Sequence, residues 1–353
     1  MNAEDDFLRQ RVPPQQQQPR PWTPPPPQQP QQQPQPQPMA SYPPGPMPRP
    51  QPARGWRRVV LSATLGLVNL GPSPAEREEM AYQAAIRSLP NGGYKVGVLG
   101  KGGVGKTTVA ASVGSVFAAL RRADHVVAVD ADTAFGRLGS RIDPHATSSY
   151  WDLAADQSMQ SFADISGRVG ANAAGLYVLV GEPAAGSRRI LDAALYREAA
   201  LRLDRHFTIS IIDCGSTMDS PVTQEALRDL DALIVVSSPW ADGAGAAAKT
   251  MEWLADRGQG GLLQRTVVVL NDSDGHADRR TRSTLTAQFL QHGQAVVEVP
   301  FDPHLRPGGV IDVMSEMAPA TRRRFLQIAA IVAHYFASRP QRRDSKPGRT
   351  QST

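Results

Sequence analysis

The sequence predicts an α/β protein built on a doubly wound, mostly parallel sheet in three α/β/α layers. Two observations predict this class: short apolar runs alternate with helical segments from residue 94 to residue 337, and the runs are nearly continuous in Val, Ile and Leu. Continuous apolar runs are typical of strands buried on both faces. The expected strands span residues 94–100, 125–132, 176–180, 208–213, 232–237, 266–271 and 295–300.

Residues 1–54 form a separate segment with a different composition. They hold more than half of the 31 prolines of the chain, interleaved with glutamine runs. Such a segment has too few apolar side chains to offset the entropy of ordering its backbone. We predict a disordered Pro/Gln-rich arm rich in polyproline II. It is either a spacer or a docking segment for a partner that recognises proline.

Residues 55–93 are expected to be an accessory helical segment. A first short helix would carry Trp56, Val59, Val60 and Leu67 on one face, and a second would begin at Pro74 and end near residue 89. The two helices form a hairpin that packs on the core or on a partner. A membrane anchor is the less favoured alternative, because the apolar stretch is short.

Residues 100–108 read GKGGVGKTT and match the phosphate-binding pattern G-x-x-x-x-G-K-[ST] between a strand and a helix. Glycines leave the backbone N–H groups open to phosphate oxygens, Lys106 reaches the β and γ phosphates, and Thr107 offers a hydroxyl to Mg²⁺. The motif predicts a P-loop NTPase fold over residues 94–338 that binds a nucleoside triphosphate with Mg²⁺; the family resemblance given below implies that this nucleotide is ATP. The expected phosphate contacts are Gly100, Lys101, Gly102, Gly103, Val104, Gly105, Lys106, Thr107 and Thr108.

Polar residues follow several of the expected strands, at the sheet edge where ligands bind in such folds. Asp213 is the candidate Mg²⁺ residue, acting through water. Asp132 is the candidate for orienting the attacking water, whereas Asp130 is structural or a more distant Mg²⁺ group. Later strand ends add three candidate nucleotide contacts: Asn271, Pro300 and Asp302.

The loop, with Lys101 directly after its first glycine, resembles the deviant Walker A motif of the MinD/ParA family of ATPases. The runs at 129–132 and 211–217 resemble the switch I and switch II segments of that family. The runs at 268–272 and 299–305 resemble its adenine-binding segments. A closer resemblance is to the EspI-like proteins associated with type VII (ESX) secretion, carried by the Pro/Gln-rich arm, the segment at 56–76 and the string DCG at 213–215.

The resemblance implies a homodimer that closes over ATP, with Lys101 of each subunit reaching the phosphates of the other. Hydrolysis would relax switch segments around Asp132 and Gly215 and open the dimer. The ATPase would be slow without a partner, and that partner would be a secretion component. Cys214–Ser216 departs from the usual switch II, which leaves the hydrolysis rate and the coupling partner open. The alternatives are a DNA-partitioning ATPase and a nucleotide-gated scaffold with little turnover.

The remaining signals concern partners and location. The net charge is +5, and arginines gather near residues 49–58 and again towards the end of the chain, where 339–353 is expected to be a basic disordered tail. These termini would allow weak contact with DNA or an anionic membrane. The final helix, near residues 320–337, is expected to pack on the core more readily than on a membrane. The single cysteine, Cys214, and the lack of a signal core favour a cytoplasmic protein, peripheral at most at the inner membrane face.

Overall fold

The computed structural model describes residues 51–52, 55–65, 67–132, 136–156, 158–181 and 190–339. The chain divides into a unit Met1–Arg49 and a unit Pro50–Thr353. The first unit, with it nearly all of the predicted arm, and the predicted tail after Arg339 lie outside the described residues.

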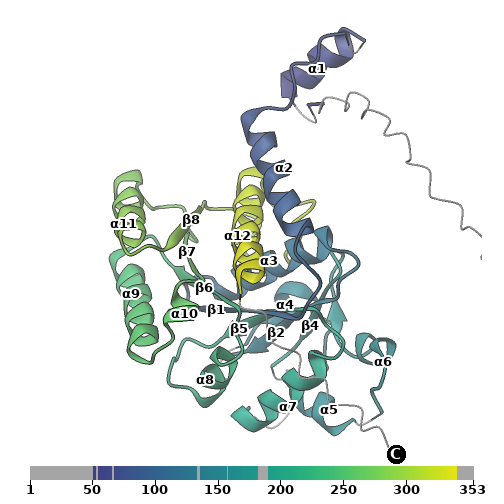
Figure 1. Ribbon diagram of the computed structural model, residues 1–353, viewed down its shortest axis with the longest axis vertical. Helices are drawn as coiled ribbons and strands as arrows, with labels where there is room; N and C mark the ends of the chain where they lie inside the picture. Colours follow the sequence, from purple (N-terminus) through teal and green to yellow (C-terminus); the bar gives the residue numbers. More distant parts are fainter. Residues whose placement is uncertain are drawn as a thin grey trace, which may run out of the picture. The chain divides into compact units, whose positions relative to one another are not determined.

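The described residues form one eight-stranded sheet in the order β3-β4-β2-β5-β1-β6-β7-β8 (Figure 1). All neighbouring strands pair in parallel except β3, which runs antiparallel to β4 at the edge. The predicted fold class is therefore confirmed. The strands are β1 Tyr94–Gly100, β2 Val126–Ala131, β3 Gly170–Ala171, β4 Leu176–Leu179, β5 Ile209–Cys214, β6 Ala232–Ser237, β7 Thr266–Asn271 and β8 Ala295–Val299.

Helices cover both faces of the sheet, and each face has its own hydrophobic core. One face is covered by α2 Pro74–Arg87, α3 Lys106–Leu120, α4 Leu138–Ile142 and α12 Pro319–Ser338. The other face is covered by α5 Tyr150–Ala155, α6 Phe162–Ser166, α7 Ala193–Leu203, α8 Pro221–Leu227, α9 Ala241–Asp256, α10 Gly260–Leu263 and α11 Arg279–Gln291. This is the three-layer arrangement that the alternating apolar runs predict.

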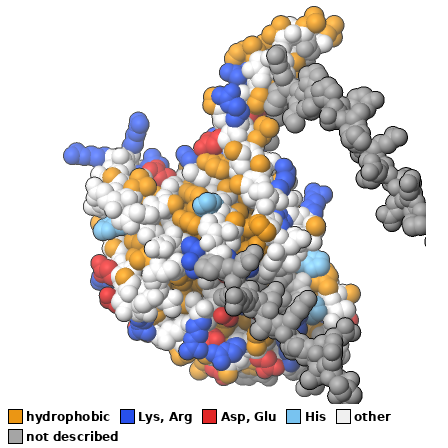
Figure 2. Space-filling view, in the orientation of Figure 1, with side chains coloured by type: hydrophobic (Ala, Val, Ile, Leu, Met, Phe, Trp, Pro, Cys, Tyr) orange, Lys and Arg blue, Asp and Glu red, His pale blue; other side chains and the backbone are white. Residues whose placement is uncertain are grey.

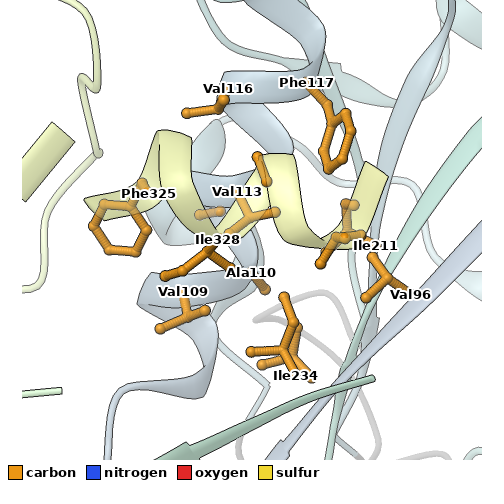
Figure 3. Close-up of a cluster of buried hydrophobic side chains, with 14 of the residues drawn as sticks. Val96, Val109, Ala110, Val113, Val116, Phe117, Ile211, Ile234, Phe325 and Ile328 are labelled. Carbon is orange, nitrogen blue, oxygen red and sulfur yellow. The ribbon is translucent and has the colours of Figure 1, made fainter. Parts of the chain in front are cut away.

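The final helix is part of the core, as predicted. Phe325 and Ile328 of α12 are fully buried against Val109 and Val113 of α3, beside strand residues such as Ile234 (Figure 3). Arg339 closes α12 by donating to Asp231 and lying over the ring of Tyr94. None of the described helices is long and apolar enough to cross a bilayer.

The segment 55–93 contains two helices that differ in their contacts. In α2, Ser73 caps the helix in a reciprocal pair with Glu76, and Ile86 enters the core shared with α3 and α12. Arg121, just after α3, donates to the carbonyl oxygens of Ile86 and Leu89 and so anchors the end of α2. By contrast α1, Gly55–Ala63, has no buried residue.

Candidate functional site

The phosphate loop joins β1 to α3 in a conformation that needs glycine at two positions. Gly105, which precedes α3, has a φ of +96°, and a Cβ there would lie 2.4 Å from Asn271 Nδ2. A Cβ on Gly100 would lie 2.2 Å from the Val236 carbonyl oxygen of the adjacent strand. A Cβ on Gly102 or Gly103 would meet no atom within 4 Å apart from its own chain neighbours. The loop is thus packed at its two ends and open in the middle, which suits an approaching anion.

Side chains from two directions brace the loop. Lys106 is buried, and its Nζ donates to the carbonyl oxygen of Lys101 across the loop, at 3.4 Å. Asn271, the last residue of β7, donates from Nδ2 to the Val104 carbonyl oxygen at 2.9 Å. Asn271 therefore supports the backbone of the loop in addition to bordering the cavity beside it. No side chain caps the first turn of α3, so its N–H groups face the loop.

Asp213 lies beside the first turn of α3, in β5 between β1 and β2. It is buried, and neither carboxylate oxygen has a hydrogen bond of normal geometry to any described residue. Burial raises the pKa of Asp213 to about 7, although the Thr107 hydroxyl and the Lys106 ammonium lower it. A buried carboxylate without a partner is costly unless a cation joins it. Asp213 and Thr107 supply the hard oxygen ligands that Mg²⁺ prefers.

Asp130 and Asp132 have different surroundings. The Asp130 carboxylate accepts hydrogen bonds from the backbone N–H groups of Asp132 and Leu138, and so closes the loop between β2 and α4. Burial and the neighbouring Asp213 raise the pKa of Asp130 to about 8. Asp132 instead borders the cavity, and its Oδ1 lies 3.5 Å from the position of a Cβ on Gly215. The Asp130 carboxylate therefore stabilises the backbone of this segment, whereas Asp132 borders the cavity next to the phosphate loop.

A cavity of about 550 Å³ extends from the phosphate loop to the ends of β7 and β8. Its walls include Thr107, Thr108, Pro300 and Phe301. Asp302 also borders it, but the carboxylate of Asp302 accepts from the backbone N–H groups of His304 and Ala318. Those two bonds hold the loop that follows β8. Asp302 thus shapes this wall of the cavity through the backbone.

Arg141 is a cavity residue that the sequence analysis did not identify. It comes from the short helix α4, is buried, and donates to the Thr108 hydroxyl at 3.0 Å and to the carbonyl oxygens of Leu305 and Gly309. Burial lowers the pKa of this arginine. The guanidinium thus ties α3, α4 and the loop after β8 together. No sequence motif predicts a buried arginine at this position. The one hint in the sequence is a charged residue beside apolar residues in the short helix Leu138–Ile142.

Lys101 does not border the cavity of its own chain. Its Nζ forms an ion pair with Asp242 Oδ2 in the first turn of α9, at 2.7 Å, with both side chains at least half exposed. The structure therefore brings Lys106, Thr107, Asp213 and Asp132 together and directs Lys101 elsewhere. Cys214 is buried beside this group, and burial raises the pKa of its thiol to about 12.

A larger cavity of about 850 Å³ lies between α9 and α11. Small residues of α9, such as Ala244 and Ala248, face Leu285 and Phe289 across it. The described strand ends and the phosphate loop do not border this cavity.

Comparison with known proteins agrees with this geometry. Residues 98–307 match the family model described as the CobQ/CobB/MinD/ParA nucleotide binding domain. The chain belongs to this family. The matched region begins inside β1 and ends in the loop that Arg141 holds, so it includes every strand end that borders the cavity.

Two relatives of known description are similar to this chain in sequence. The chain is 32% identical over 286 residues to the ESX-1 secretion-associated protein EspI from two strains of Mycobacterium tuberculosis, which confirms the EspI-like resemblance. That alignment covers 80% of this chain and 42% of the relatives, so the chain spans about two fifths of their length.

The cell division ATPase MinD of Pyrococcus furiosus has a TM-score of 0.52 at 21% identity, and the alignment covers 69% of this chain and 99% of that one. The MinC:MinD complex of Aquifex aeolicus has a TM-score of 0.51 at 16% identity, with 71% and 99% covered. At these identities the two structures support the fold alone.

Proposed function

We propose that residues 94–338 form an ATPase domain that binds ATP with Mg²⁺ at the phosphate loop, hydrolyses it slowly and dimerises in the ATP state. One observation carries the proposal: Asp213 is buried beside Thr107 and the buried Lys106, and its carboxylate has no hydrogen bond of normal geometry to any described residue. A fold tolerates such an uncompensated carboxylate where a ligand completes it.

The roles in binding follow from the loop geometry. Backbone N–H groups around Gly102, Gly103 and Gly105 would hold the β and γ phosphates, together with the uncapped start of α3. Lys106 would exchange its weak bond to the Lys101 carbonyl oxygen for the phosphates. Thr107, and Asp213 through water, would hold Mg²⁺, which neutralises charge on the phosphate oxygens.

Hydrolysis would use the residues on the switch side of the cavity. Asp132 faces the site and is positioned to orient a water molecule towards the γ phosphate. Gly215 lies close to Asp132, so a change at one switch segment reaches the other. Pro300, Asn271 and the loop held by Asp302 and Arg141 would enclose the adenine.

Dimerisation would recruit Lys101. In the structure Lys101 pairs with Asp242 on the surface, and an exposed ion pair of this kind contributes little to stability. Triphosphate in a facing subunit offers a stronger partner. We infer that Lys101 leaves Asp242 on closure and neutralises phosphate charge across the interface.

The partner of the ATP state is proposed to be a component of a secretion machinery, acting in the cytoplasm. This rests on the likeness to the secretion-associated EspI proteins and therefore extends what the fold alone supports.

Calorimetry with ATP and Mg²⁺ tests the binding step. Wild-type protein should take up one nucleotide per chain, and Lys106→Ala should weaken binding by about 100-fold, because charge-assisted contacts to phosphate are lost. Lys249→Ala, an exposed lysine on α9, is the matched control and should bind like wild type. No uptake by folded wild-type protein would refute the proposal.

Light scattering with a slowly hydrolysed ATP analogue tests the dimer. Wild-type protein should double in mass, and Lys101→Ala should remain a monomer while binding nucleotide normally. A Lys101→Ala variant that dimerises like wild type would disprove the role given to Lys101.

A further inference from the structure

The segment around α1 exposes an unusual number of large apolar side chains. Trp56 is 65% exposed, Val59 66%, Leu65 94% and Leu67 89%, and Val68 and Leu70 are also exposed. We call these six residues the α1 surface. They lie within 15 residues of the chain, whereas the other large exposed apolar residues of the described chain are scattered. Contiguous exposed apolar surface marks an interaction site.

The helix itself is amphipathic, and no residue on its apolar face is buried by the part of the chain that the structure describes. Trp56, Val59, Val60 and Ala63 follow the i, i+3, i+4, i+7 spacing and so share one face of α1. No residue of α1 is buried. Figure 2 shows hydrophobic side chains gathered along α1, with basic side chains beside them.

Hydrogen bonds hold the connector after α1 in a defined conformation. The Arg57 guanidinium donates to the carbonyl oxygens of Leu70, Gly71 and Pro72, at 3.3 to 3.4 Å. The Thr64 hydroxyl donates to the Val60 carbonyl oxygen and accepts from the Val68 N–H. The connector is therefore tied back to the helix through Arg57, the chain neighbour of Trp56.

Leu65 carries backbone strain in addition to exposure. Its φ is +50°, in the left-handed region, and it is the sole non-glycine residue of the described chain with a positive φ. A leucine in this conformation is strained, and glycine would avoid the strain. Neither the strain nor the exposure helps the isolated chain to fold, so both indicate a contact made by this side chain.

The charge of the segment selects the occupant. Residues 51–75 contain three arginines and no acidic residue, and the sequence as a whole has no acidic residue between Asp6 and Glu76. We propose that the α1 surface binds anionic lipid headgroups, with α1 in the plane of the bilayer interface. Trp56 and the leucines would enter the boundary between headgroups and acyl chains, and Arg58 would stay at the phosphates.

Lipid fits this surface better than nucleic acid does. Nucleic-acid phosphates are bound by cationic and polar groups, and the six apolar side chains of the α1 surface would gain nothing there. An anionic bilayer interface binds both the apolar side chains and the arginines, and tryptophan is enriched at the interfaces of membranes. The apolar stripe of α12 is not available for this purpose, because it is buried in the core.

Vesicle flotation of the full chain tests the proposal without nucleotide. Wild-type protein should float with vesicles of phosphatidylcholine and phosphatidylglycerol in equal parts, and not with phosphatidylcholine alone. Trp56→Ser and Leu67→Ser should each lower the partition coefficient by about tenfold, as expected for a large apolar side chain leaving the interface. Arg58→Gln should lower it by about fivefold.

Leu290→Ser is the matched control, because Leu290 on α11 is an exposed leucine outside the α1 surface, at 54%. It should float like wild type, and so should Lys106→Ala, which separates this test from that of the ATP site. Wild-type protein that stays with the soluble fraction would overturn the proposal, as would Trp56→Ser and Leu67→Ser variants that float unchanged. Binding of the same surface to a protein or to a second copy would then be the conclusion.

Discussion

In most proteins charged side chains are exposed and apolar side chains are buried, and the phosphate loop and the α1 surface depart from this rule in opposite ways. At the loop, charged groups are buried: Lys106, Asp130 and Asp213 are all nearly inaccessible to solvent. At the α1 surface, apolar groups are exposed, with Leu65 and Leu67 almost fully accessible. Between the two lies α2, which follows the rule, with its buried residue in the core and its charged residues outside.

The difference teaches that the two regions need different ligands. A buried carboxylate lowers stability until a cation reaches it, which supports the proposed metal ion with its phosphate at the loop. An exposed apolar stripe gains free energy only when another apolar phase covers it. Buried charges and exposed apolar side chains lower the stability of a fold, so functional sites are expected where they occur.

Phe325, buried between α12 and the helix that follows the phosphate loop, is expected to have the largest effect on stability. Phe325→Ala should lower the free energy of unfolding by about 3–5 kcal/mol, because it leaves a cavity between α12 and α3. Urea unfolding followed by circular dichroism measures this loss. A change below about 1 kcal/mol would mean that α12 is not packed as described.

The strained end of the phosphate loop predicts the next largest effect. Gly105→Ala should cost about 2–3 kcal/mol, because alanine would adopt a φ near +96° and its Cβ would displace Asn271 from Val104. Gly102→Ala is the matched control in the same loop, since its Cβ would meet open space. Equal losses of stability in the two variants, measured by urea unfolding, would contradict the described loop conformation.

The buried carboxylates predict a dependence on pH in the absence of nucleotide. Burial raises the pKa of Asp213 to about 7 and that of Asp130 to about 8, from 3.8. The unfolded chain therefore releases these protons at lower pH than the folded chain, and folding loses stability as the pH rises from about 4 to about 8.

Asp213→Asn removes one of these charges. It should raise the free energy of unfolding at pH 8 by about 1.4 kcal/mol or more, the value of one pKa unit, and flatten the pH dependence. The same variant should lose the stabilisation that Mg²⁺ with ATP gives to wild type. Urea unfolding at several pH values, with and without Mg²⁺ and ATP, measures both effects. A variant less stable than wild type at pH 8 would show that the interactions of the charge with Thr107 and Lys106 outweigh the cost of its burial.

The sequence allowed the parts of the fold that repeat a pattern to be predicted. All seven expected strands are present, and the phosphate loop lies between β1 and α3 as its motif requires. The two-residue strand β3 and the short helices α4–α6 escaped prediction, because elements of this length carry no periodicity. In the proposed site, the motif predicted Lys106 and Thr107, and the strand ends predicted Asp213 and Asn271. Arg141 and the pairing of Lys101 with Asp242 depend on tertiary contacts across distant segments, which no local pattern encodes.

The exposed aromatic residue of the α1 surface predicts the smallest effect on stability and gives the sharpest contrast with Phe325. Trp56→Ala should change the free energy of unfolding by no more than about 0.5 kcal/mol, because Trp56 is 65% exposed and α1 has no buried residue. The same substitution should reduce vesicle binding, as is expected of Trp56→Ser. Parallel urea unfolding of Trp56→Ala and Phe325→Ala makes the comparison direct. If Trp56→Ala cost as much as Phe325→Ala, the indole would be part of the core, and the α1 surface could not be free to bind lipid.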